Sequence, residues 1–147
     1  GLGARPDGDG LPTLSFPTNV SCTPTEVLER SAPVRILEKA LLPGSGGTGQ
    51  FRGGLGQRVA MEVTSARPIT LAVLSQRLNF PPRGRQGGEN GSVERIVLNG
   101  EPVEGGTSFQ LNRGDVIVLE LPGGGGFGNI DERSASLLAA DRKSGLA

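Results

Sequence analysis

Residues 121–129 read LPGGGGFGN and form the densest of three glycine clusters in the chain. The other two clusters are PGSGGTGQFRGGLG at residues 43–56 and PPRGRQGGENG at residues 81–91. Sixteen of the 25 glycines fall in these clusters, whereas a chain of this length should carry roughly ten glycines in all. Glycine is expected where a chain adopts positive φ or closely approaches another backbone or a ligand. The clusters therefore predict shaped loops on a scaffold.

Short apolar runs with a period of two lie between the glycine clusters. They predict strands at about residues 34–42, 58–63, 69–74, 93–98 and 115–121, with a short partner strand around Val103. Asn99-Gly100 is a strong signal for a hairpin turn after the fourth strand. The expected fold class is mainly β, a sandwich or barrel of five to seven strands. A length of 147 residues matches a single β-rich domain covering residues 1–147.

Two helices are expected beside the strands, a short one near residue 25 and one at the C-terminus. Thr23 is the predicted N-cap of the first helix, with Pro24 at its first position and Glu26 closing a capping box. Pro33 keeps this helix short. The second helix is predicted over residues 131–143, with acidic residues in its first turn and Gly145 as its stop.

The composition argues against several classes of function. Fifteen basic residues balance 15 acidic ones, and five dispersed Phe residues are the only aromatics, so neither nucleic-acid binding nor membrane-surface binding is expected. No apolar run reaches the length of a membrane span, and no signal-peptide core opens the sequence, which favours a cytoplasmic protein. Histidine is absent and Cys22 is the single cysteine. Disulfide frameworks, multi-cysteine zinc sites and Ser-His-Asp triads are thereby excluded, and Cys22 is expected to be a small packed residue.

Two matches to the nucleotide-binding pattern G-x-G-x-x-G fail on their context. After residues 44–49 come Gln and Phe instead of the Lys of a phosphate loop, and a glycine-rich segment follows instead of a helix. Residues 123–128 lie between a strand and a helix, but no second parallel strand follows, and Asp141 lies within the predicted helix. A weaker reading remains, in which loop amides and a helix N-terminus bind an anion. The alternative is that the glycines let the backbone pass closely under another segment.

Candidate substrate- or anion-binding residues follow from this reading of the glycine clusters. They are Arg52, Gly53, Gly54, Gly124, Gly125 and Gly126. Arg52, Arg83 and Arg85 flank glycine clusters and are suited to clamp a carboxylate through paired hydrogen bonds, with solvated loop arginines as the alternative. No catalytic residue and no metal ligand can be assigned from the sequence.

Several segments together resemble a known family. They are TEVLE at 25–29, SGGTGQFRGGLG at 45–56, FPP at 80–82 with Gly87-Gly88, and LPGGGGFG at 121–128 with Glu132-Arg133. In this order they resemble the C-terminal part of the hydantoinase B / 5-oxoprolinase family, which includes the B subunit of ATP-dependent N-methylhydantoinase and subunits of acetone and acetophenone carboxylases. Arg83 stands where an aromatic residue is common in that family, which leaves the substrate open.

The resemblance implies the C-terminal domain of an ATP-dependent cyclic-amide hydrolase subunit, as a fragment of a longer hydantoinase B-type polypeptide. A hydantoinase A-type subunit or domain would bind ATP and phosphorylate the carbonyl, and the B part would take the activated species onward. This chain would then bind no cofactor itself, while ATP and a divalent metal serve the full hetero-oligomer. Its partners would be the A-type subunit and the rest of its own B subunit, and the isolated chain would be inactive. The alternative is a non-catalytic structural or subunit-interface domain of that complex, or of a related ATP-dependent ketone carboxylase.

Overall fold

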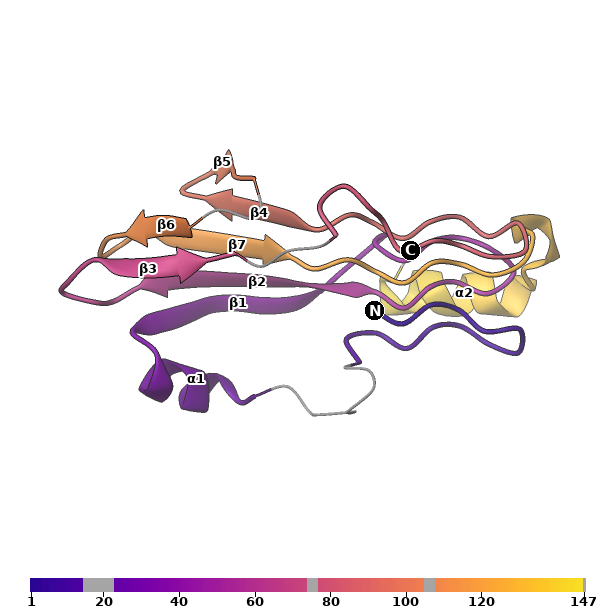
Figure 1. Ribbon diagram of the computed structural model, residues 1–147. Coiled ribbons are helices and arrows are strands. Elements are labelled where there is room, and N and C mark those ends of the chain that lie inside the picture. The colour runs from indigo at the N-terminus through magenta and orange to yellow at the C-terminus, as the bar shows by residue number, and fades with distance from the viewer. Residues whose placement is uncertain (15–22, 74–76, 105–107, 147) are drawn as a thin grey trace.

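The computed structural model describes residues 1–14, 23–73, 77–104 and 108–146 (Figure 1). Its elements are α1 (Thr25–Ser31), β1 (Val34–Leu42), β2 (Gly56–Val63), β3 (Ile69–Ala72), β4 (Arg95–Leu98), β5 (Glu101–Pro102), β6 (Ser108–Leu111), β7 (Val116–Glu120), the 3₁₀ helix η1 (Ile130–Glu132) and α2 (Ala135–Ser144). The predictions for Cys22 and for the last residue of the 69–74 strand lie outside the described residues.

The strands form two antiparallel sheets that share one apolar core. Five strands are ordered β1-β2-β7-β4-β5, and β3 pairs with β6 in a second sheet. The core contains Val63 of β2, Ile117 of β7 and Leu111 of β6, each at most 2% exposed. Ile69 and Leu71 of β3 pack against these residues, so the core lies between the two sheets. The prediction of a mainly β fold is confirmed.

The strand predictions agree with the structure except at one element. The first predicted strand coincides with β1, and those predicted at 58–63, 93–98 and 115–121 end within two residues of the ends of β2, β4 and β7. The strand predicted at 69–74 starts where β3 starts, and the short strand predicted around Val103 corresponds to β5, which ends at Pro102. Asn99 and Gly100 have positive φ, 52° and 90°, and they join β4 to β5 as predicted for a hairpin turn. The strand β6 was not predicted, because SFQL is too short and too polar to show a clear period.

Both helix starts differ from the predictions. Pro24, not Thr23, is the N-cap of α1, and no side-chain cap bond forms. The predicted capping box is therefore wrong. At the C-terminus the chain forms η1, adopts an extended backbone at Arg133, and begins α2 only after Ser134. Ser134 is the N-cap of α2, and its hydroxyl accepts a hydrogen bond from the Leu137 amide. The predicted stop is confirmed, since Gly145 is the C-cap with a left-handed backbone at φ 64°.

The other half of the molecule consists of extended segments that pair outside the two sheets, with α2 alongside them (Figure 1). We call this half the glycine bundle; it comprises residues 1–4, 45–49, 51–55, 82–85, 88–92 and 122–128. The segment 122–128 lies at its centre and exchanges hydrogen bonds with all the others. Examples are Ala4 N to Gly125 O at 2.8 Å, Gly124 N to Gly54 O at 2.8 Å and Arg85 N to Gly126 O at 2.9 Å. A strand in a sheet pairs with at most two neighbours, whereas the central segment pairs with five, so we describe the arrangement as a bundle and not as a sheet.

The central segment meets the same neighbour every third residue. A methyl group on Gly123 would overlap the Ser45 carbonyl, and one on Gly126 would overlap that of Thr48, three residues further on. Methyl groups on Gly124 and Gly125 would overlap the carbonyls of Leu2 and Arg83. A three-residue repeat is typical of polyproline II-like packing, in which only glycine fits at a crowded axis. Close passage of the backbone therefore accounts for the glycines of residues 123–126.

Candidate functional site

Arg52, the arginine among the predicted site residues, belongs to a cluster of four charged side chains, of which Arg133 and Asp141 are buried and Arg52 and Asp9 are partly exposed. Arg133 donates to both carboxylate oxygens of Asp9, at 2.8 and 2.9 Å, and to Asp141 at 2.6 Å. Arg52 donates through Nη2 to Asp141 at 3.3 Å and through Nη1 to the Gly53 carbonyl at 2.7 Å. We call these four residues the ion cluster. It joins the N-terminal segment, the glycine bundle and α2.

The charges of the ion cluster balance within the protein. The side chains of Arg133 and Asp141 are only 2% and 10% exposed. Burial raises the pKa of Asp9, but hydrogen bonds from the Arg133 side chain and the Arg52 amide outweigh it, so the pKa of Asp9 lies below its usual value. Two arginines face two aspartates, and the Arg52 guanidinium donates its hydrogen bonds to Asp141 and to the Gly53 carbonyl within the protein. Substrate binding by Arg52 stays a prediction.

Most amides of the predicted glycine residues already donate to backbone carbonyls. Gly53 donates to Gly47 and Gly54 to Leu2, at 2.9 and 2.8 Å. Gly124 donates to Gly54 and Gly126 to Glu89, at 2.8 and 2.9 Å. An anion would have to compete with these carbonyls for the same donors. Gly125 differs, because its buried amide has no hydrogen-bond acceptor among residues 1–14, 23–73, 77–104 and 108–146.

Gly125 also lines a groove with a volume of about 530 Å³, which we call the arginine groove. Its lining residues are Gly1, Gly3, Arg77, Phe80, Pro81, Pro82, Arg83, Arg85, Gly124 and Gly125. Three of these residues are arginines and none is acidic. In the described part of the chain, neither Arg83 nor Arg85 has a salt-bridge partner. The groove therefore presents uncompensated positive charge.

The backbone around the arginine groove is fixed by the glycine bundle. The Gly91 amide donates to the Pro82 carbonyl at 2.9 Å, and the Gly84 amide donates to the Asn90 side chain at 3.0 Å. One residue further, the Arg85 amide donates to Gly126 at 2.9 Å. These bonds hold the arginine-bearing segment against the central glycine segment, so the positions from which the guanidinium groups extend are set before any ligand arrives.

The structure thus brings together four of the residues that the sequence singled out and separates others. Gly124, Gly125, Arg83 and Arg85 share the arginine groove. Arg52 lines a different hollow of about 230 Å³, beside Leu138 and Leu146. Sequence reasoning did not select Arg77, and the only signal for it is a further arginine just upstream of the FPP segment.

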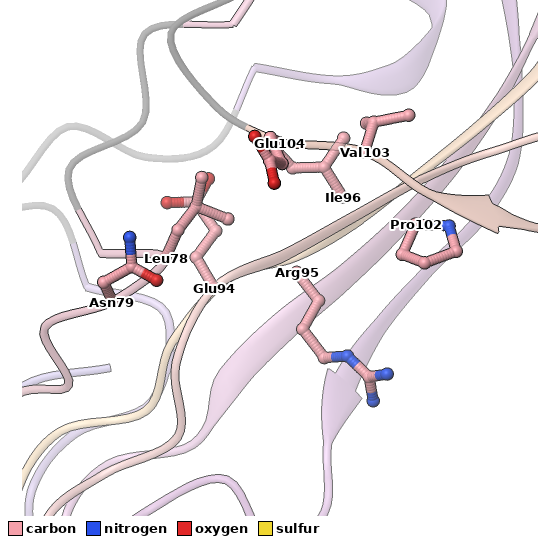
Figure 2. Close-up of a pocket in the computed structure, with 8 residues that line it drawn as sticks. All are labelled: Leu78, Asn79, Glu94, Arg95, Ile96, Pro102, Val103 and Glu104. Carbon is pink, nitrogen blue, oxygen red and sulfur yellow. The ribbon is translucent and has the colours of Figure 1, made fainter.

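A further hollow of about 370 Å³ lies beside β4 and β5 (Figure 2). Leu78, Ile96 and Val103 give it an apolar part, and Glu94 and Glu104 supply two carboxylates, while the Arg95 side chain extends away from Glu104. Neither acid is without an interaction partner. Throughout the described ranges, no three His, Cys, Asp or Glu side chains gather as a metal site would require. Within the same ranges, no helix has the length and apolar character needed to cross a membrane.

Comparisons with a family model and with individual proteins agree on one family. Residues 1–130 match the family Hydantoinase B/oxoprolinase. The chain is 39% identical over 139 residues to a 5-oxoprolinase of Dictyostelium discoideum, covering 89% of this chain and 11% of the relative. It is 32% identical over 130 residues to the caprolactamase subunit beta of Pseudomonas jessenii, covering 82% of this chain and 22% of the relative.

A solved structure extends this agreement from sequence to fold. The ATP-dependent caprolactamase from Pseudomonas jessenii superposes with a TM-score of 0.81 at 26% identity, covering 99% of this chain and 27% of that chain. The chain thus spans between 11% and 27% of the length of these proteins. Because the family match extends over 130 of its 147 residues, the chain belongs to the Hydantoinase B/oxoprolinase family.

Proposed function

We propose that this chain is a β-rich domain of a longer B-type subunit in an ATP-dependent cyclic-amide hydrolase. The observation that carries the proposal is the match to the family over residues 1–130. The superposition with an ATP-dependent caprolactamase over 99% of the chain supports it. The substrate is a lactam or hydantoin ring, whose amide bond is opened by water at the expense of ATP.

The ATP site belongs to an A-type subunit or domain in this proposal. The G-x-G-x-x-G segment 123–128 and residues 45–49 of the other lie inside the glycine bundle, where Gly47 donates to Gly124 and Gly126 donates to Glu89. A phosphate loop needs such amides free for phosphate oxygens. The relative from Pseudomonas jessenii is named a subunit beta, which supports a partner subunit of the A type. A divalent metal, where the assembly uses one, would be held outside this chain.

The test is ring opening by the complete B-type polypeptide together with its A-type partner. The substrate panel contains 5-oxoproline, hydantoin, N-methylhydantoin and caprolactam, and the readouts are ADP and the ring-opened acid. We expect ring opening of at least one compound, coupled to ADP formation and dependent on both polypeptides. The 147-residue chain alone should be inactive. Ring opening without ATP, or turnover by this chain alone, would contradict the proposal.

A second function, as an interface domain without a catalytic role, is favoured by one observation. The helix α1 has no buried residue, and Val27 of α1 and Leu37 of β1 are 52% and 51% exposed. Leu41, also on β1, is 39% exposed. Apolar residues gathered at an edge strand mark contact with another protein surface. In that case Leu37→Ser would release the A-type partner from the complete polypeptide, while substitutions in the arginine groove would leave ring opening unchanged.

A further inference from the structure

We propose that the arginine groove binds a compact oxyanion, a phosphate or a carboxylate, that carries no positively charged group. This inference deepens the proposed function and rests on it for the identity of the natural ligand.

The amide of Gly125 is a hydrogen-bond donor that the fold leaves unused within the described residues. Gly125 is buried, and its N–H donates to nothing within the described ranges, whereas the amides of Gly124 and Gly126 on either side are bonded. The buried residues Gly46 and Gly49 share this state within those ranges, but they line the hollow beside Leu138 and Leu146, not the arginine groove. Buried backbone N–H groups are almost always satisfied, because an unmade hydrogen bond costs free energy. Since Gly125 lines the arginine groove, an acceptor bound there would satisfy it.

The side chains of the arginine groove carry charge of one sign. Arg77, Arg83 and Arg85 line it, and no carboxylate does. In the ion cluster, by contrast, each arginine is matched by an aspartate. The planar fork of a guanidinium matches the paired oxygens of a carboxylate or phosphate. Arg83 and Arg85 extend from a backbone fixed by the glycine bundle, so binding has to order the side chains but not the backbone.

The charge of the groove also determines which ligands it would reject. Opening a lactam breaks the C–N bond, joins the water oxygen to the carbonyl carbon, and leaves the nitrogen as an amine that is protonated at neutral pH, whereas a hydantoin leaves an uncharged ureido nitrogen. The ring-opened product of a lactam therefore carries an ammonium group, whereas a substrate carboxylate or a phosphorylated ring species carries negative charge only. Three arginines with no acid beside them repel an ammonium. The groove accordingly favours the anionic species before ring opening over the amino acid after it.

The test is titration calorimetry on this chain with three probes: inorganic phosphate, glutarate and glutamate. Glutarate and glutamate differ by the ammonium group. We expect phosphate or glutarate to bind, and the tighter of the two shows whether the groove takes a phosphate or a carboxylate. Glutamate should bind at least several-fold more weakly than glutarate. Arg83→Gln and Arg85→Gln should each weaken binding about tenfold, the loss expected for one hydrogen bond to a charged group.

Arg113→Gln is the matched control, because Arg113 is an exposed arginine in the turn between β6 and β7. It should leave binding unchanged, and all three variants should keep the thermal midpoint of the parent chain. Equal losses in Arg113→Gln and Arg83→Gln, or glutamate binding as tightly as glutarate, would overturn the proposal. The titration contains neither ATP nor a cyclic amide, so its result does not depend on that of the hydrolysis assay. Oxyanion binding by this chain without ring opening by the complete polypeptide would support the binding site and contradict the proposed function.

Discussion

At the scale of single residues, the glycines serve two different physical needs. Gly124 has no room for a side chain, because a methyl group there would overlap the Leu2 carbonyl. Gly100 has open space around it, but its φ of 90° is one that L side chains rarely adopt. The sequence predicts that glycine is required in both places. It cannot say which need applies, because the close contact of Gly124 involves a segment more than 100 residues away.

Gly124→Ala should strongly destabilise the fold. The added methyl group meets backbone atoms, which cannot move without breaking the hydrogen bonds of the glycine bundle, so we expect a loss of about 3 kcal/mol or more in the free energy of unfolding. Urea unfolding followed by circular dichroism measures this loss. Gly8→Ala is the control, since the added methyl group would meet only the tip of the Arg5 side chain, at 3.6 Å. A stable Gly124→Ala variant would contradict the bundle packing.

The ion cluster should be equally sensitive to the loss of one charge. Asp141→Asn leaves Arg52 and Arg133 with Asp9 as their remaining acid, and breaking a buried ion pair on one side costs about 3–5 kcal/mol. Asp7→Asn is the control, because Asp7 pairs with Arg5 at the surface and is 81% exposed, so its loss should change stability by about 0.5 kcal/mol or less. By the same reasoning Arg52→Ala lowers the thermal midpoint, which a purely ligand-binding role for Arg52 would not do.

Asp9 gives the ion cluster a predictable pH dependence. Hydrogen bonds from Arg133 and Arg52 hold the pKa of Asp9 below its value in the unfolded chain. Its contribution to stability is therefore fully present above pH about 4 and is lost as the pH falls through the lower, folded-state pKa. Unfolding midpoints in urea between pH 2 and pH 6 should show this loss, and it should be smaller in Asp9→Asn. An identical pH profile for the two proteins would show that Asp9 does not cause the loss of stability at low pH.

At the scale of elements, prediction succeeded where local sequence decides and failed where a distant contact decides. The strand β1 and the Asn99-Gly100 turn depend on alternation and on positive φ, and both were predicted. The start of α2 was not, because Arg133 leaves the helical conformation to place its side chain between Asp9 and Asp141. No sequence pattern near residue 133 reports the position of residue 9.

The β4–β5 turn supplies a test at this scale. Gly100→Ala should destabilise the protein by about 1–2 kcal/mol, the cost of a left-handed backbone for a residue with a Cβ. Gly100→Asn should cost less, because Asn tolerates that conformation better. Thermal unfolding of the two variants separates backbone strain from crowding. Equal losses in both would point to a steric cause, which the open space around Gly100 does not provide.

At the scale of the whole molecule, two constructions are joined end to end. The sheets enclose an apolar core around Val63, Leu111 and Ile117. The glycine bundle instead relies on backbone hydrogen bonds and the ion cluster, with α2 alongside. Composition and periodicity predicted the first half. The second half could be predicted only as a set of glycine-rich loops, since bundling depends on which segments meet.

The candidate site was predicted in part for the same reason. Arg83 and Arg85 were singled out because they adjoin a glycine cluster, and the arginine groove contains both. Arg52 satisfied the same criterion, yet it lies in the ion cluster because Asp141 of α2 reaches it. The free amide of Gly125 could not be distinguished from its bonded neighbours in a run of four identical residues.

The most direct measurement of the central claim is ATP-coupled ring opening by the complete B-type polypeptide with its A-type partner, in parent, Arg83→Gln/Arg85→Gln and Arg113→Gln forms. We predict that the double variant loses ring opening at least tenfold while its thermal midpoint stays that of the parent, and that Arg113→Gln keeps full activity. Undiminished ring opening by the double variant would show that the arginine groove takes no part in the reaction.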